Sequence, residues 1–130
     1  MAKEEYIFQL SMLEQEMNSL AEKVQIIDQH ILELQGLYFS LQELDKSKEK
    51  EILANLGKNI FIKTEIKEKK LLVDVGSKIF VKKEIPETLK IVEEQVSQLE
   101  NAKNQVMRKL QELKIQVDNI IEQAEKSEGK

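Results

Sequence analysis

Residues 57–66 read GKNIFIKTEI, and residues 76–85, nineteen positions later, read GSKIFVKKEI. In both copies apolar and polar side chains alternate with a period of two, which is typical of a β-strand. A glycine opens each copy and follows a short apolar segment, as the tight loop of a hairpin requires. The sequence therefore predicts two similar β-hairpins, at residues 51–66 and 71–85.

These hairpins need something to pack against. A two-stranded hairpin is only marginally stable alone, and short strands leave open edges. The repeat is therefore interpreted as an assembly device, in which the apolar hairpin faces meet other subunits. The residues expected at this oligomer interface are Ile60, Ile62, Ile66, Val73, Val75, Ile79, Val81 and Ile85.

The segment before the hairpins, residues 5–45, has the heptad pattern of a coiled coil. Its apolar residues recur in steps that alternate between four and three, which defines a narrow a/d seam along one helix. Gly36 lies off this seam. The seam residues are Tyr6, Leu10, Leu13, Met17, Leu20, Val24, Ile27, Ile31, Leu34, Tyr38 and Leu41.

The segment after the hairpins, residues 86–126, repeats the pattern. It opens with Pro86, which suits the first position of a helix because the N–H there would be unbonded anyway. The only polar seam member is Lys103, whose stem can lie along the seam while its ammonium group reaches water. The seam residues are Leu89, Val92, Val96, Leu99, Lys103, Val106, Leu110, Leu113, Val117, Ile120 and Ala124.

The two seams match when the second helix folds back on the first. With Leu41 facing Leu89, Ile27 faces Lys103 and the two seams end together. The predicted fold is therefore mainly α: a long antiparallel coiled-coil hairpin with two β-hairpins at its base. The alternative is that each helix pairs with another chain, which the phase of the pattern does not exclude.

Composition excludes several functional classes. The 130 residues are 34% charged, carry a net charge of −4 and include no basic block, so nucleic acid is not expected as a partner. The sequence has no cysteine, which excludes disulfides and thiol catalysis. The N-terminal apolar stretch contains acids, unlike a signal peptide, and no window reaches the roughly 18 apolar residues of a membrane span. The chain is therefore expected to be cytoplasmic and to have no membrane partner.

An enzyme is not expected either. His30 is the only histidine and has charged neighbours, as a solvated helix residue does. There is no phosphate-binding G-x-x-x-x-G-K-[ST] loop and no Cys/His cluster for zinc. The sequence thus predicts no catalytic, cofactor or metal site, and a function based on binding.

Taken together, the long helix, the paired hairpins in LGKNIFIKTEI…LLVDVGSKIFVKKEI and the long returning helix resemble prefoldin. Two hairpins are the arrangement of its α-type subunit, and the resemblance covers nearly the whole chain, 1–130, as one domain. It implies a hexamer of two α-type and four β-type subunits, held by a β-barrel made of the hairpins. It also implies an ATP-independent chaperone (a holdase) that binds unfolded client proteins at its coiled-coil tips and delivers them to a cytosolic group II chaperonin.

The free end of the helix pair offers side chains for such binding. Off-seam apolar residues gather there, and exposed apolar groups at a free end could bind unfolded chains by non-directional burial. Scattered exposed apolar residues are also normal on any protein surface. The expected client-binding residues are Tyr6, Ile7, Phe8, Leu10, Met12, Ile120, Ile121 and Ala124.

Two other functions remain open from the residues alone. The same hairpins could polymerise end on end into a filament or scaffold, because a contact that does not close produces a fibre. The coiled coil could also be an adaptor that tethers one folded partner. An adaptor would have one saturable partner and no general effect on aggregation.

Overall fold

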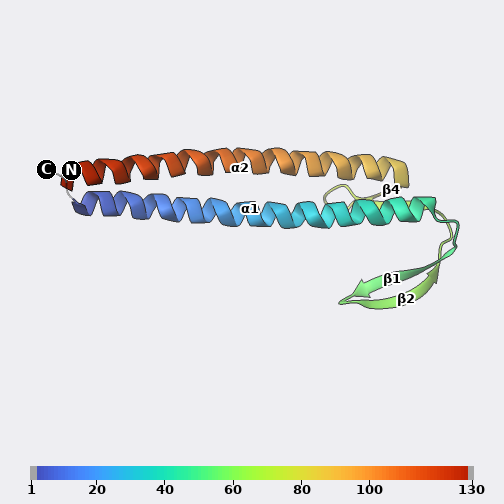
Figure 1. Ribbon diagram of the computed structural model, residues 1–130. Helices are drawn as coiled ribbons and strands as arrows, with labels where there is room; N and C mark the ends of the chain where they lie inside the picture. The colour runs from blue at the N-terminus through green and yellow to red at the C-terminus, as the bar shows by residue number, and fades with distance from the viewer. Residues whose placement is uncertain (1–2, 129–130) are drawn as a thin grey trace. The chain divides into compact units, whose positions relative to one another are not determined.

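The computed structural model describes residues 3–128. Two long helices run antiparallel, and the two hairpins lie between them in the sequence (Figure 1). The predicted mainly-α fold class is therefore confirmed. The helices begin and end within two residues of their predicted bounds. The elements in order are α1 (Lys3–Lys46), β1 (Glu51–Gly57), β2 (Ile60–Glu65), β3 (Lys70–Asp74), β4 (Phe80–Glu84) and α2 (Ile85–Glu128).

The chain forms two compact units. The first contains the described residues up to Leu32 together with those from Ser97 onward, and the second contains Glu33–Val96. The first unit is thus the free-end half of the helix pair, which we call the tip unit. The second, the base unit, holds both hairpins and the adjoining turns of both helices.

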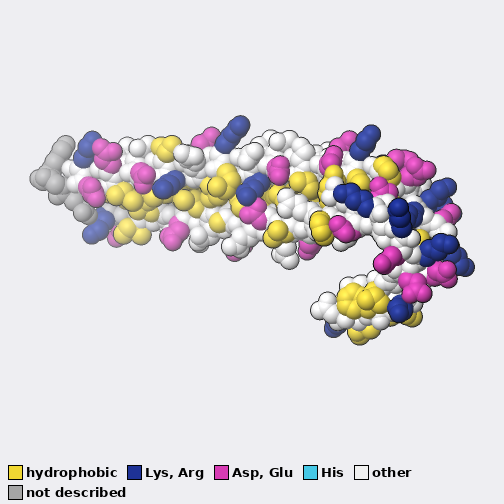
Figure 2. All heavy atoms as spheres, turned by 45° about the vertical axis from the view of Figure 1, so that its right-hand side comes forward, with side chains coloured by type: hydrophobic (Ala, Val, Ile, Leu, Met, Phe, Trp, Pro, Cys, Tyr) yellow, Lys and Arg dark blue, Asp and Glu magenta, His cyan; other side chains and the backbone are white. Residues whose placement is uncertain are grey.

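In the tip unit, the heptad seam is the buried part of the helix pair. Ile31 and Leu113 are 9% and 2% exposed, and every other seam residue of this unit is at least partly shielded. Figure 2 shows hydrophobic side chains along the line where the helices meet. The polar seam residue Lys103 lies partly buried, and its Nζ is 2.7 Å from Oδ1 of Asp28 on α1. Its ammonium group therefore ends at a carboxylate of the facing helix, next to the predicted partner Ile27.

In the base unit, the core joins the helices to the second hairpin. Leu41, Ile85 and Val92 are its buried centre, and Leu71 of β3 packs against it together with partly buried helix residues. The Tyr38 hydroxyl donates a hydrogen bond of 2.6 Å to Oε1 of Glu93, which ties α1 to α2 at this level.

The start of α2 differs from the prediction in one residue. Ile85 was expected to end the hairpin and to face other subunits, but it is the first residue of α2 and is only 1% exposed. It packs in the chain's own core with Leu41 and Val92, so that prediction was wrong for Ile85. The backbone turns into the helix just before Pro86, which redirects the Ile85 side chain inward.

Both hairpins are antiparallel, and corresponding residues of the two repeat copies are paired in the same way. Ala54 pairs with Ile62 in the first hairpin, and Val73 pairs with Val81 in the second. On the opposite faces, Asn55 pairs with Phe61 and Asp74 with Phe80. The repeat seen in the sequence is therefore a repeat in three dimensions as well.

The hairpin loops share one turn geometry. Gly57 has φ 128° and Gly76 has φ 111°, so both glycines occupy the positive-φ region as predicted. The two residues after each glycine also have positive φ, between 48° and 63°, which is the signature of a type I′ loop.

A side chain supports each glycine. The Gly57 amide donates to Oδ1 of Asn55 and the Gly76 amide donates to Oδ1 of Asp74, both at 2.8 Å. Asn and Asp favour such turns because their short side chains bond the backbone two residues on. The repeat therefore begins two residues before each glycine, at Asn55 and Asp74. Each copy starts with Asx-x-Gly, which is followed by the two-residue loop.

Candidate functional site

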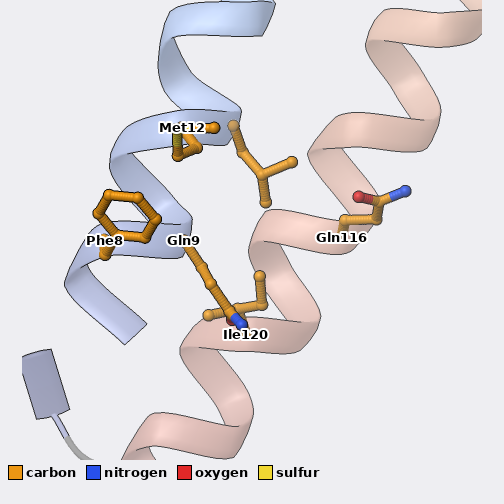
Figure 3. Close-up of a pocket in the computed structure, with 6 residues that line it drawn as sticks. Phe8, Gln9, Met12, Gln116 and Ile120 are labelled. Atoms are coloured by element: carbon orange, nitrogen blue, oxygen red, sulfur yellow. The ribbon is translucent and has the colours of Figure 1, made fainter. Parts of the chain in front are cut away.

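The tip unit carries an open groove between the two helices. It has a volume of about 410 Å³ and is lined by Phe8, Gln9, Met12 and Leu13 from α1 and by Gln116 and Ile120 from α2. Phe8 and Met12 are one helical turn apart, so their side chains lie on the same side of α1, as Figure 3 shows. Leu13 and Ile120 belong to the seam and form the apolar floor of the groove.

Exposure identifies which of these residues are available to a partner. Phe8 is 66% exposed and Met12 is 56% exposed. A methionine side chain is flexible and adapts to partners of different shape. The groove therefore presents accessible apolar surface that neither helix covers.

The structure divides the predicted client-binding residues into three groups. Phe8, Met12 and Ile120 come together at the groove. Ile7 and Ile121 are exposed but do not line it, and their heptad positions place them on the other flank of the helix pair. The remaining three are seam residues that the facing helix shields, namely Tyr6, Leu10 and Ala124.

Sequence reasoning missed three lining residues: Gln9, Leu13 and Gln116. Gln9 and Gln116 both occupy g positions, which flank the seam on the same side of an antiparallel pair. Their heptad position was therefore a signal that could have found them. The prediction did not include these two glutamines because it rested on apolar side chains alone.

The hairpins form a second apolar surface. Ile60 and Ile62 of β2 are 62% and 51% exposed, and Ile79, just before β4, is 58% exposed. On the opposite faces of the hairpins, Phe61 and Phe80 are exposed as well. Figure 2 shows hydrophobic side chains at the surface of the β1–β2 hairpin. Apolar strands this exposed are typical of a surface that another chain covers.

Charged side chains of the base unit hold the turn between the hairpins. Lys82 Nζ lies 2.7 Å from Oε1 of Glu68, and this hydrogen bond and charge lower the pKa of the Glu68 carboxyl. Lys69 donates to the main-chain oxygens of Asp45 and Ser47 at the end of α1. These contacts attach the linking turn to the end of α1 and to β4.

The described residues contain no group of three or more potential metal ligands. Within residues 3–128, no helix is long and apolar enough to cross a membrane. Two apolar surface features stand out among the described residues, the tip groove and the exposed hairpin faces.

Comparison with known proteins identifies the same architecture. The family model described as "Prefoldin subunit" matches residues 13–129. No curated protein matches the chain. A cryo-EM structure of filamentous PFD from Methanocaldococcus jannaschii superimposes with a TM-score of 0.76 at 20% identity, covering 86% of this chain and 94% of that one.

The family match takes in α1 from residue 13 onward, both hairpins and the whole of α2, which are the elements that carry the resemblance seen in the sequence. Prefoldin is a non-enzymatic chaperone, which agrees with the prediction that the chain is not an enzyme. The chain belongs to the prefoldin family, and its order of helix, two β-hairpins and helix is the layout of the α-type subunit.

Proposed function

We propose that this chain is a subunit of an ATP-independent holdase that binds unfolded proteins at the tip of its helix pair. The observation that supports this most directly is the open apolar groove at Phe8, Met12 and Ile120, in a chain of a chaperone family. Unfolded segments expose apolar side chains, and burying them against this groove releases water without requiring a particular sequence. No step in this binding needs a nucleotide.

Assembly is the second part of the proposal. The exposed apolar hairpin faces join those of β-type prefoldin subunits in a β-barrel, with two copies of this chain and four of the other. Closing the sheet removes the open edges and buries the apolar faces. Ile85 is left out of the proposed interface because its side chain is in the chain's own core. The interface residues are Ile60, Ile62, Ile66, Val73, Val75, Ile79 and Val81.

The third part concerns the fate of the client. As the family resemblance implies, the loaded complex acts in the cytoplasm and passes its client to a group II chaperonin. A holdase that binds through weak, non-directional apolar contacts releases its client readily, which suits transfer to a second chaperone.

The tip groove can be tested by making it polar. In the double variant Phe8→Ser with Met12→Ser, the assembled complex should bind a denatured client about tenfold more weakly, since most of the accessible apolar surface of the groove is lost. The measurement is light scattering from a chemically denatured protein diluted into increasing amounts of complex.

The matched control is Ile26→Ser. Ile26 is 57% exposed on the same helix but lies about 21 Å from Met12 along α1, at 1.5 Å per residue. This variant should protect the client as well as the unaltered chain does. Equal protection by all three complexes, with assembly intact by native mass spectrometry, would show that the groove is not the client site.

A filament is the second candidate, and one observation favours it. One similar solved structure is a filamentous PFD, and the similarity of fold covers 94% of that chain. If this chain assembles in that way, its hairpins pair with further copies of itself and the contact does not close. The mass of the assembly distinguishes this arrangement from the hexamer.

A further inference from the structure

A second hollow continues the tip groove toward the start of α1. It has a volume of about 380 Å³ and is lined by Glu4, Glu5, Phe8 and Gln9. Phe8 and Gln9 also line the apolar groove, so the two hollows share a wall. A segment lying in the groove and extending past Phe8 therefore meets two carboxylates.

The rest of this end of the tip unit is acidic as well. Lys126 is paired within the same helix, with its Nζ 3.3 Å from Oε1 of Glu122. Carboxylates outnumber lysines in the described segments 3–13 and 117–127. The acids there are Glu4, Glu5, Asp118, Glu122 and Glu125, and the bases are Lys3 and Lys126.

The helix dipole accounts for only part of this pattern. Glu4 and Glu5 lie in the first turn of α1, where negative side chains interact favourably with the dipole. Glu122 and Glu125 lie near the end of α2, where the dipole favours cations instead. Glu122 is offset by its ion pair with Lys126 in the same helix, but the dipole does not account for Glu125. The net negative charge of this end attracts cationic partners.

We propose, on the basis of the proposed function, that the tip selects unfolded segments in which an apolar stretch is flanked by lysine or arginine. The apolar stretch contacts Phe8, Met12 and Ile120, and the flanking cation reaches Glu4 and Glu5. Lysine and arginine suit this geometry because their aliphatic stems lie along apolar surface while their charged ends extend beyond it. Segments flanked by acids are repelled by the same carboxylates.

Three labelled peptides test this selectivity on the full-length chain in its assembled complex. They share one apolar core and differ only in their flanks, which are lysine, serine or glutamate. The lysine-flanked peptide should bind about three- to tenfold more tightly than the glutamate-flanked one, as expected for exposed ion pairs. The difference should shrink at about 0.5 M salt, because screening shortens the range of exposed charges.

The residues responsible are tested by removing charge without changing shape. Glu4→Gln with Glu5→Gln should abolish the preference and leave binding of the serine-flanked peptide unchanged. Glu14→Gln with Glu22→Gln removes the same charge from α1 outside either hollow, and should keep the preference. Far-UV circular dichroism of both variants checks that α1 is intact.

The outcomes separate this inference from the function on which it rests. If none of the peptides binds, the tip groove is not a client site and the proposed function fails with it. If all three bind equally, the groove binds clients but the charge selectivity is wrong. If the Glu14 and Glu22 control also loses the preference, the effect is one of total charge and the assignment to Glu4 and Glu5 is overturned.

Discussion

Two single side chains show how the helix pair accommodates polar groups at its seam. Lys103 occupies a seam position, yet its ammonium group lies 2.7 Å from the Asp28 carboxylate, on a partly exposed flank. Tyr38 also occupies a seam position and directs its hydroxyl to Glu93. In both cases the apolar part of the side chain fills the seam and the polar end bonds to the facing helix. Such residues restrict the register at which the helices can pair.

The Tyr38 contact predicts a pH dependence of stability. The hydrogen bond to the Glu93 carboxylate, with burial and the nearby negative charge, raises the pKa of Tyr38 above its ordinary value of 10.0. The folded chain therefore holds this proton more tightly than the unfolded chain does. The contact stabilises the fold at any pH below the ordinary pKa and is lost as pH rises through the raised value.

Urea unfolding between about pH 8 and pH 11.5 measures this effect, a window that brackets the ordinary tyrosine pKa. Lysines also titrate in this range, so the quantity to compare is the difference between the unaltered chain and Tyr38→Phe. That difference in unfolding free energy should be largest at pH 8 and should fall at the alkaline end. A difference that stays constant across the range would mean that the hydroxyl does not stabilise the fold through its proton.

At the scale of elements, the two hairpins use the same turn and the two helices use the same seam. Each turn combines an Asx side chain, a glycine with positive φ and a two-residue type I′ loop. Each helix alternates shielded seam residues with exposed flanks. Because both hairpins have this turn, they are alike in structure although their strand sequences differ at several positions.

Two glycines in different elements should respond to alanine in opposite ways. Gly36 lies inside α1, and nothing lies within 4 Å of an added Cβ, so Gly36→Ala should stabilise the chain by about 0.5–1 kcal/mol. Gly76 also has open space, but its φ of 111° is one that a side chain rarely adopts. Gly76→Ala should therefore destabilise the β3–β4 hairpin by more than about 1 kcal/mol.

Thermal unfolding measures the first effect, and hydrogen exchange of residues 70–84 measures the second. Gly76→Ala should accelerate exchange in that segment, while Gly36→Ala should leave it unchanged. Slower or unaltered exchange in the Gly76 variant would show that the loop reaches another conformation without strain.

At the scale of the whole molecule, the exposed apolar hairpin faces predict that the chain does not function alone. The native mass of the complex recovered from its own cells should correspond to two copies of this chain and four of a β-type subunit. The expected reason is that six subunits contribute enough strands to close a barrel, whereas the four strands of one chain do not.

A ladder of masses made of this chain alone would contradict the hexamer and favour the filament. Variants of the hairpin faces provide the matching control. Ile62→Lys should prevent both the hexamer and the filament, because it places a charge in the proposed interface. Ile115→Lys, at an exposed residue of α2, should leave assembly intact.

The sequence alone was sufficient to predict the two helices with their seams, the two hairpins and the resemblance to the family, and the matched seams favoured antiparallel pairing. The helices, seams and hairpins follow from local periodicity: a 3.5-residue repeat produces a seam and a two-residue repeat produces a strand face, wherever the chain goes next. Only the tertiary structure decided that Phe8, Met12 and Ile120 share a groove with two glutamines while Ile7 and Ile121 do not line it. Only the tertiary structure placed Ile85 in the core and directed Tyr38 to Glu93. The physical reason is that a groove or a buried contact depends on which flanks of two distant helices meet and on where the backbone turns, and periodicity along one helix specifies neither.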